Sequence, residues 1–344
     1  MRYLVIAATA VTFASPVFAH HSDAALDMSS LVTVKGKVTE FSLSNPHAYF
    51  SVVTQDEQGH EIEWTVQMAS RLTLARLGWT PESLTVGEEV TVGLHPARDG
   101  KPYGLMASVE KANGTALPNV GGSRRDRSSS VPVVARATSI EGKWMVDRDS
   151  LGDDYPGGLD QLMRRDLVLT EQGKAAEAAF RVEDDPLLRC VGRPTPGDIV
   201  YTDLYPLQIE INGEDTITIR SQFFDEQRTV YMDGRPHPPA SERFHEGHSI
   251  GHWEGETLVV DTANFADHRS PYQNGVPSGA RKHVVERFQL TDGGTRLTVE
   301  FTLEDPEFIA RPMTHRRKLI YAPQADMSPF NCDLESTRRY IVEE

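Results

Sequence analysis

The feature that most constrains the fold is a series of short, alternating apolar segments in the second half of the chain. Turn pairs such as Asn212-Gly213, Asp233-Gly234 and Glu254-Gly255 separate many of these segments, and such pairs commonly join antiparallel strands. We expect strands over residues 207–211, 216–224, 226–232, 248–253, 257–261, 283–291, 296–303, 316–321 and 338–342. About nine short strands in succession predict a closed or nearly closed antiparallel barrel, with a cavity able to hold one small ligand.

The start of this half supports the same architecture. Gly142-Lys143-Trp144 resembles the Gly-x-Trp motif that opens the first strand of lipocalin-like barrels, where the Trp closes one end. Residues 159–169 and 171–180 favour helices. We therefore predict a calycin-like, mainly β domain with minor helices over residues 140–344.

A smaller barrel is expected before it. Residues 31–41, 47–54, 61–68, 86–94 and 105–111 are β-prone, and a helical stretch over 69–77 ends at Gly78. Three strands, a helix and two strands is the order of a five-stranded OB-type barrel. We assign residues 20–112 to this domain. Residues 113–139, rich in Gly, Ser and Pro with little apolar periodicity, are assigned to a linker.

The first residues are typical of an export signal. Arg2 precedes an apolar run, and Val17-Phe18-Ala19 is a small-x-small cleavage site. We expect a signal peptide over residues 1–19, cleavage after Ala19, and a periplasmic or secreted protein. No later segment approaches the roughly 18 apolar residues that a spanning helix needs, so no membrane insertion is expected. The formal charge of −15 argues against nucleic acid as a partner, and the sequence leaves the oligomeric state open.

Cys190 and Cys332 are the two cysteines of the chain. In an oxidising compartment they are able to form one disulfide that joins the two ends of the second half. Two buried thiols are the alternative interpretation.

A candidate copper site follows from the predicted cleavage. His20 would then combine an α-amine with an imidazole, His21 would add a second imidazole, and His47 is a candidate third ligand. Such nitrogen donors suit Cu(II), whereas a frayed terminus is the structural alternative. Apart from this copper, no cofactor is expected, because no phosphate-binding Gly-rich loop opens a helix.

Histidines concentrate in one stretch of the second half, four of them within residues 237–252. We predict that His237 or His248 acts as acid or base, because imidazole titrates near neutral pH and a neighbouring carboxylate orients it. The candidate orienting carboxylates are those of Asp233, Asp261 and Glu286. The alternative is a structural network that satisfies buried turn amides.

The same stretch supplies candidate ligand contacts. Arg235 or Arg287 is expected to hold an anionic or phenolic oxygen, and Tyr231, His252 and Trp253 complete the expected binding surface. No His-Glu-x-x-His zinc signature occurs, and Gly247-His248-Ser249-Ile250-Gly251 is not a Gly-x-Ser-x-Gly nucleophile elbow.

The leading hypothesis is therefore an exported protein that binds a small, partly apolar or aromatic molecule in its second barrel. Cofactor-independent acid/base catalysis, as in a lyase, isomerase, hydratase or hydrolase, is the expected chemistry if it is an enzyme. A non-catalytic ligand carrier, a copper-binding protein and a purely structural role are the alternatives.

Two resemblances fit this organisation. The motifs Ala19-His20-His21-Ser22, Asn45-Pro46-His47-Ala48, Trp64 to Met68 and Gly78-Trp79 resemble an uncharacterised bacterial family of small exported domains. The second half resembles another uncharacterised bacterial family, through the motifs Tyr231-Met232-Asp233-Gly234-Arg235-Pro236-His237-Pro238 and Gly247-His248-Ser249-Ile250-Gly251-His252-Trp253-Glu254-Gly255. The tail around Cys332 is shorter than that family often shows. Neither resemblance implies a reaction.

Overall fold

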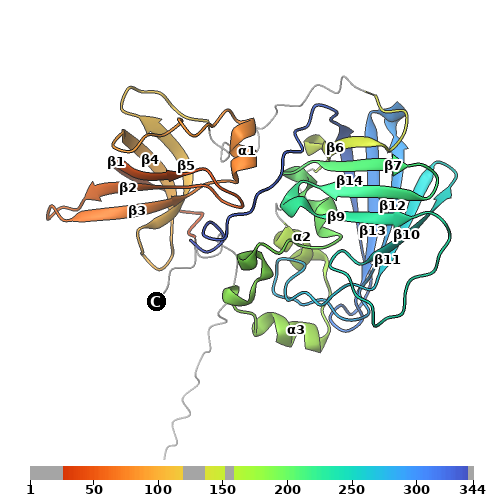
Figure 1. The fold of residues 1–344 in the computed structure, drawn as a ribbon. Coiled ribbons are helices and arrows are strands. Elements are labelled where there is room, and N and C mark those ends of the chain that lie inside the picture. The colour runs from red at the N-terminus through yellow and green to blue at the C-terminus, as the bar shows by residue number, and fades with distance from the viewer. Residues whose placement is uncertain (1–25, 119–135, 152–158, 340–344) are drawn as a thin grey trace, which may run out of the picture.

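The computed structural model describes residues 26–118, 136–151 and 159–339. Within these ranges the chain forms two closed β-barrels that lie side by side (Figure 1). The predicted fold class, mainly β with a small barrel followed by a larger one, is confirmed.

The described part of the first barrel has five strands and one helix. They are β1 (Val32–Ser42), β2 (Tyr49–Gln55), β3 (Glu61–Gln67), α1 (Arg71–Arg76), β4 (Glu89–Pro96) and β5 (Tyr103–Lys111). The strand order is β1-β2-β3-β5-β4, closed by the pairing of β1 with β4, with the helix between β3 and β4. Ser70 caps α1 by accepting a hydrogen bond from the Thr73 amide at 3.2 Å.

The second barrel contains nine strands in the described residues. They are β6 (Gly142–Val146), β7 (Leu207–Asn212), β8 (Thr216–Ser221), β9 (Gln227–Tyr231), β10 (His248–Glu254), β11 (Thr257–Ala263), β12 (His283–Thr291), β13 (Arg296–Glu304) and β14 (Met313–Tyr321). Trp144, in the predicted Gly-x-Trp motif, is fully buried and packs against Tyr321 with ring centroids 5.1 Å apart.

Short helices fill the connection between β6 and β7. They are α2 (Leu159–Asp166), α3 (Glu171–Ala178) and α4 (Gly197–Val200). Single 3-10 turns occupy residues 148–150, 182–184, 186–189, 201–203, 223–225 and 292–294. No helix in the described ranges is long and apolar enough to cross a membrane.

The prediction of a strand over residues 338–342 is wrong for the two residues that the structure describes. Arg338 and Arg339 lie in a turn, and the remaining three residues are outside the described ranges. The barrel is closed instead by β6, which pairs with β14 on one side and with β7 on the other. Both pairings join strands that are far apart in the sequence, so strand propensity alone does not predict which strand closes the barrel.

In the second barrel, one strand pair of the described residues departs from the expected antiparallel pattern. β9 and β10 run parallel, and their ladder has just two residue pairs among the described residues, Val230 with Ser249 and Tyr231 with Ile250. A parallel pair needs a long crossover connection, and residues 232–247 provide it here. The barrel wall therefore has a short seam at this point.

The segment after β14 returns to the first barrel (Figure 1). Cys332 on this segment forms the predicted disulfide with Cys190, with Cα atoms 5.9 Å apart. The Asn45 side chain of the first barrel donates to the Phe330 carbonyl and accepts from the Leu72 amide. The returning segment thus links the two barrels and is covalently attached to the second.

Candidate functional site

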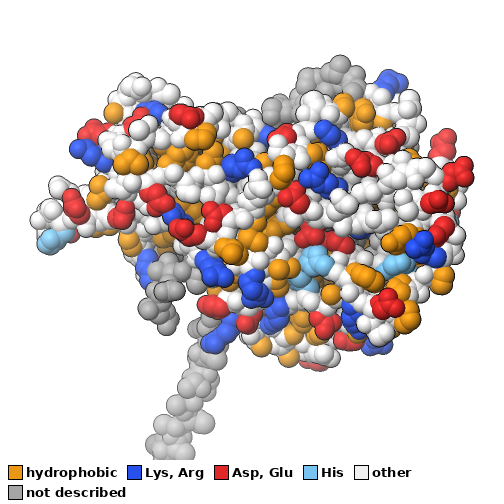
Figure 2. Space-filling model, viewed as in Figure 1, with side chains coloured by type: hydrophobic (Ala, Val, Ile, Leu, Met, Phe, Trp, Pro, Cys, Tyr) orange, Lys and Arg blue, Asp and Glu red, His pale blue; other side chains and the backbone are white. Residues whose placement is uncertain are grey.

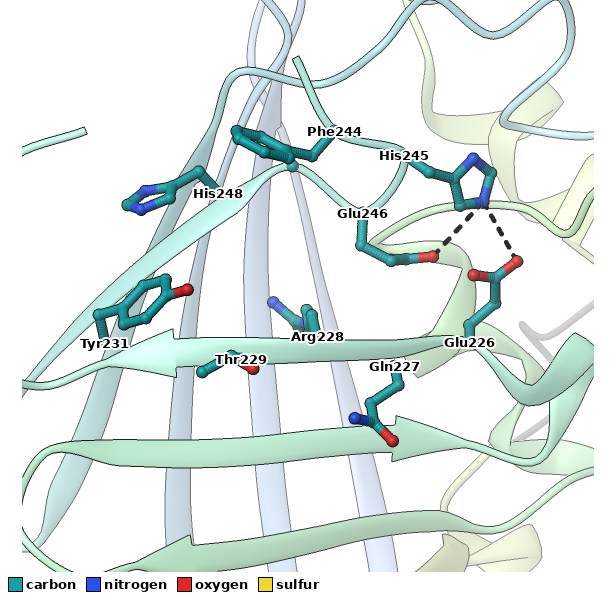
Figure 3. Close-up of a pocket in the computed structure, with 10 residues that line it drawn as sticks. Glu226, Gln227, Arg228, Thr229, Tyr231, Phe244, His245, Glu246 and His248 are labelled. Atoms are coloured by element: carbon teal, nitrogen blue, oxygen red, sulfur yellow. Dashed lines mark hydrogen bonds and ion pairs between the residues drawn. The ribbon is translucent and has the colours of Figure 1, made fainter. Parts of the chain in front are cut away.

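The seam between β9 and β10 opens into a pocket of about 390 Å³. The strands pair at Val230 and Tyr231, whereas the residues that precede them on both sides diverge. Two consecutive stretches line the opening. They are Glu226 with Gln227, Arg228, Thr229 and Tyr231 of β9, which it precedes, and Phe244, His245, Glu246, Gly247 and His248 leading into β10 (Figure 3).

One end of this pocket holds an imidazole between two carboxylates. His245 Nε2 lies 3.1 Å from a Glu226 oxygen and 3.7 Å from Glu246 Oε1. The other Glu246 oxygen accepts hydrogen bonds from the amide and hydroxyl of Thr195, at 3.0 and 3.2 Å. Burial raises the pKa of Glu246 well above its usual range, and the nearby Glu226 carboxylate raises it further. This end therefore places two acidic side chains around one imidazole, and the Glu246 carboxyl group favours its protonated form.

The sequence analysis missed Glu226 and Glu246. Both lie outside the strands that carry the predicted histidines, and acidic residues in loops are common. The available signal was His245 directly beside Glu246, just before a strand, but that pair alone does not predict a contact with Glu226, 19 residues away in the chain.

The other end of the pocket carries three aromatic rings. The His248 ring stacks on Tyr231, with centroids 5.1 Å apart and an interplanar angle of 21°. The Phe244 ring lies 6.2 Å from His248. Two of the predicted residues, Tyr231 and His248, thus line the pocket, and Phe244 adds an aromatic side chain that was not predicted.

Behind His248, the structure brings together three residues of the predicted acid/base set. His237 Nδ1 lies 3.0 Å from His248 Nδ1, and His237 Nε2 lies 3.0 Å from Asp261 Oδ1. Strand pairing supplies part of this arrangement, since Asp261 on β11 faces Ile250 on β10. The Asn264 amide donates to the carbonyls of Pro238, Pro239 and Glu242, and so holds the loop that carries His237.

With both imidazoles neutral, these contacts are consistent with one arrangement of the ring protons. The Asp261 carboxylate is an acceptor, so His237 donates from Nε2 and presents an unprotonated Nδ1. His248 then donates from Nδ1, which leaves its Nε2 as a lone pair. Partial burial lowers the pKa of His248, and positive charge on His237 or Arg235 acts in the same direction.

Asp261 has a second histidine partner. His283 Nε2 lies 2.9 Å from the same Asp261 oxygen. Burial would raise the pKa of Asp261, but the hydrogen bonds from His283 and His237 outweigh it and lower the pKa. The carboxylate therefore stays ionised and keeps its orienting role toward His237.

Two of the carboxylates predicted to orient a histidine, those of Glu286 and Asp233, do not contact His237 or His248 in the described structure. Glu286 lies on the inner face of β12, fully buried, and forms two hydrogen bonds with Arg228, the longer of 2.7 Å. His248 and Asp261 lie on the outer face, so Glu286 does not orient either predicted histidine. Asp233 instead pairs with Arg235 across a turn. That pairing places the Arg235 guanidinium 4.0 Å from the centroid of the Tyr231 ring.

The remaining predicted contacts lie at the far end of β10, outside the pocket lining. His252 is 3.3 Å from Glu254, and Arg287 is 2.6 Å from the same carboxylate. Trp253 is 46% exposed. The structure therefore does not bring His252, Trp253 or Arg287 to the pocket. Histidine side chains are visible at separate places on this face of the second barrel, one of them beside acidic groups (Figure 2).

The predicted copper ligands divide between described and undescribed residues. His20 and His21 lie outside the described ranges. The His47 amide donates to Ser336 of the returning segment, and its ring lies edge-on to Tyr49. Burial lowers the pKa of His47 to about 4. In the described structure, the Asn45-Pro46-His47 motif is therefore an inter-barrel contact, and copper binding remains a prediction.

The comparisons with known proteins support the N-terminal resemblance. Residues 8–107 match a family of unknown function (DUF6152). A search of curated proteins finds no match. Among solved structures, a mutant of the fluorescent protein UnaG is similar at 14% identity, over 53% of this chain and 96% of that one, with a TM-score of 0.23. A score this low carries no argument about ligand or activity.

Proposed function

We propose that the second barrel binds a small, partly aromatic molecule in the seam pocket, and that His248 exchanges a proton with it. The main support for this proposal is the hydrogen-bonded chain from Asp261 through His237 to His248, which lines the pocket. A carboxylate that orients an imidazole, which in turn acts on a ligand, is the arrangement used for general acid/base catalysis.

The pocket's size and lining support this ligand class. A volume of about 390 Å³ lies in the range of small-molecule sites. Tyr231 and Phe244 offer apolar ring surface, and Gln227 and Thr229 offer hydrogen-bonding groups at the same opening. A ligand with an aromatic ring and an ionisable hydroxyl or an acidic C–H group would match both kinds of surface.

His248 would act as the base through Nε2. It would take the ligand proton, and the resulting imidazolium would be stabilised through His237 by the Asp261 carboxylate. Return of the proton to a different atom of the ligand would complete an isomerisation without any bound cofactor. In an elimination, the bond to the leaving group would break as the double bond forms, and the imidazolium would protonate the departing group. A carrier would use the same pocket but release the ligand unchanged.

We further propose that the protein is exported. The predicted signal peptide would direct export, and the Cys190–Cys332 disulfide is compatible with an oxidising compartment. N-terminal sequencing of the protein recovered from the periplasm tests this: a mature chain that begins at His20 is expected, and an uncleaved cytoplasmic chain would contradict it.

Binding is tested with Nile red, a neutral dye whose fluorescence rises in apolar sites. The wild type and the exposed-site control His252→Ala should enhance the emission equally, and Phe244→Ala should weaken the enhancement. Equal signals from all three proteins would refute binding at the seam.

Catalysis is tested by incubating the protein with a panel of phenols, enols and aromatic alcohols and analysing the mixtures by mass spectrometry and NMR. Conversion by the wild type that is lost in His248→Ala, with dye binding retained, supports the acid/base role. Binding of a panel member without conversion would identify a carrier. Conversion that survives His248→Ala would refute the assignment of His248.

A further inference from the structure

We infer that Glu226, His245 and Glu246 form a binding site for a divalent transition-metal ion at the end of the seam pocket away from His248. This inference goes beyond the proposed function, because the acid/base chain of His248, His237 and Asp261 needs no metal.

The geometry of the three side chains fits one shared ion. One ligand atom from each residue lies within 4.8 Å of the others. Ligands about 2.0–2.2 Å from a common ion lie roughly 3–4 Å from one another, and the imidazole-to-carboxylate distances here are 3.1 and 3.7 Å. Figure 3 shows both carboxylates turned toward the His245 ring.

An unpartnered oxygen provides the second, independent observation. Glu246 is 8% exposed, and its Oε1 has no hydrogen-bond donor among the described residues. That oxygen points toward His245, while the opposite oxygen is held by Thr195. A buried carboxylate oxygen without a donor is costly, and a bound cation would satisfy it. Thr195 would then be the outer partner that orients a metal-binding carboxylate.

The nearby buried cations are already engaged. Arg228 bonds to Glu286 and lies 3.4 Å from Asp198, while the Lys282 ammonium donates to the Thr195 carbonyl at 2.6 Å. Neither forms an ion pair with Glu226 or Glu246 among the described residues. A divalent cation bound between the two carboxyl groups would release the proton that their close approach favours and would serve as their counter-charge.

The backbone leaves room for the Glu226 carboxylate. A Cβ placed on Gly192 would lie 2.0 Å from Glu226 Oε1, which is a severe overlap. Any larger residue at position 192 must displace this oxygen from its place beside His245. Gly192→Ala therefore perturbs the site without removing any of the three donors.

The donor set indicates the class of metal. One imidazole and two carboxylates suit Zn²⁺, Mn²⁺, Fe²⁺ or Co²⁺ better than a soft ion such as Cu(I), which prefers sulfur. Three protein ligands beside an open pocket leave coordination positions for water or for a ligand oxygen. This is the pattern of an open site that exchanges ligands.

The test uses metal-free, tag-free mature protein carrying His20→Ala and His21→Ala, so that the N-terminal histidines do not contribute. Zn²⁺ is titrated calorimetrically, and Co²⁺ serves as a visible-absorption probe. One equivalent of each should bind, and Co²⁺ should give a ligand-field band.

His245→Ala and Glu226→Gln should each weaken Zn²⁺ binding by about 100-fold or more, a loss at least as large as that seen when outer partners are removed. The matched control is His252→Ala with Glu254→Gln, which removes an exposed histidine–carboxylate pair of similar spacing, 3.3 Å, and should leave binding unchanged. Circular dichroism confirms that each variant is folded. Gly192→Ala, with all donors present, is expected to shift the Co²⁺ band.

Equal Zn²⁺ affinity in the wild type and in folded His245→Ala, or no binding by the wild type, would overturn the site. His248→Ala separates the two hypotheses. This variant should still bind the metal but should no longer convert the ligand panel. If the wild type binds no metal, the Nile red experiment still tests the proposed ligand pocket on its own.

Discussion

Replacing Glu286 by Gln tests whether this residue is structural, as its position indicates, or catalytic, as its sequence context suggested. The substitution keeps the shape of the side chain and removes its charge. Glu286 is completely buried and Arg228 is 5% exposed, so the guanidinium would lose its main counter-charge inside the barrel.

The size of the effect follows from the residual partners. Breaking a buried ion pair by removing one member costs about 3–5 kcal/mol, because the other charge stays buried. Asp198 lies 3.4 Å from Arg228 and would compensate in part, so we expect a loss of about 3 kcal/mol. For a domain of this size, that corresponds to a fall in Tm of roughly 6–12 °C.

The matched control is Glu254→Gln. It breaks a Glu–Arg pair of similar length, 2.6 Å to Arg287, but both side chains are more than 40% exposed. An exposed pair contributes about 0–1 kcal/mol, so the Tm should change little. Scanning calorimetry of both variants measures the difference. If Glu286→Gln unfolds at the temperature of the control, the buried-pair argument is refuted and a functional role for Glu286 becomes tenable again.

Three further predictions concern stability. Reducing the Cys190–Cys332 disulfide, which spans 142 residues, should cost up to about 5 kcal/mol; an unchanged Tm under reductant would contradict this. Asn45→Ala leaves the Phe330 carbonyl and the Leu72 amide without their hydrogen-bond partner and should lower the free energy of unfolding by about 1–3 kcal/mol. Limited proteolysis should then cut faster between the barrels, whereas a wild-type digestion pattern would argue against an inter-barrel role. Burial, together with the charges of Arg193 and Lys282, lowers the pKa of His268 from 6.5 to about 3. The folded state favours the neutral ring, so this stability is present above pH 6.5 and is lost as the pH falls toward the folded pKa. The loss is about 2 kcal/mol by pH 5, and denaturant titrations of His268→Gln should show a weaker dependence over that interval.

Much of the strand pattern was predictable because its causes are local. Alternating apolar residues and turn pairs indicated β12 at its observed bounds, His283–Thr291, and most other strands within a few residues. The same alternation already placed Glu286 on one face with Val284 and Phe288. A carboxylate that shares a strand face with apolar residues is expected to point inward and to have a structural role. This pattern therefore indicates that Glu286 and His248 belong to different sites.

The candidate site was predictable only in part. Strand periodicity and proximity in sequence suggested His248, His237 and Asp261, and the structure places them in contact. His237 lies in a loop without periodicity, so its orientation depends on tertiary contacts such as those of Asn264. The cluster of Glu226, His245 and Glu246 has no local pattern, because it forms where two strands diverge.

The sequence by itself determined which segments become strands, where the chain turns, and which cysteines are available to pair, since these depend on neighbouring residues. Only the tertiary structure decided that β6 closes the second barrel, that Asn45 contacts the segment around Cys332, and that a pocket opens beside β10. These outcomes depend on contacts between residues far apart in the chain, and a strand's own alternation carries no information about which distant strand lies beside it.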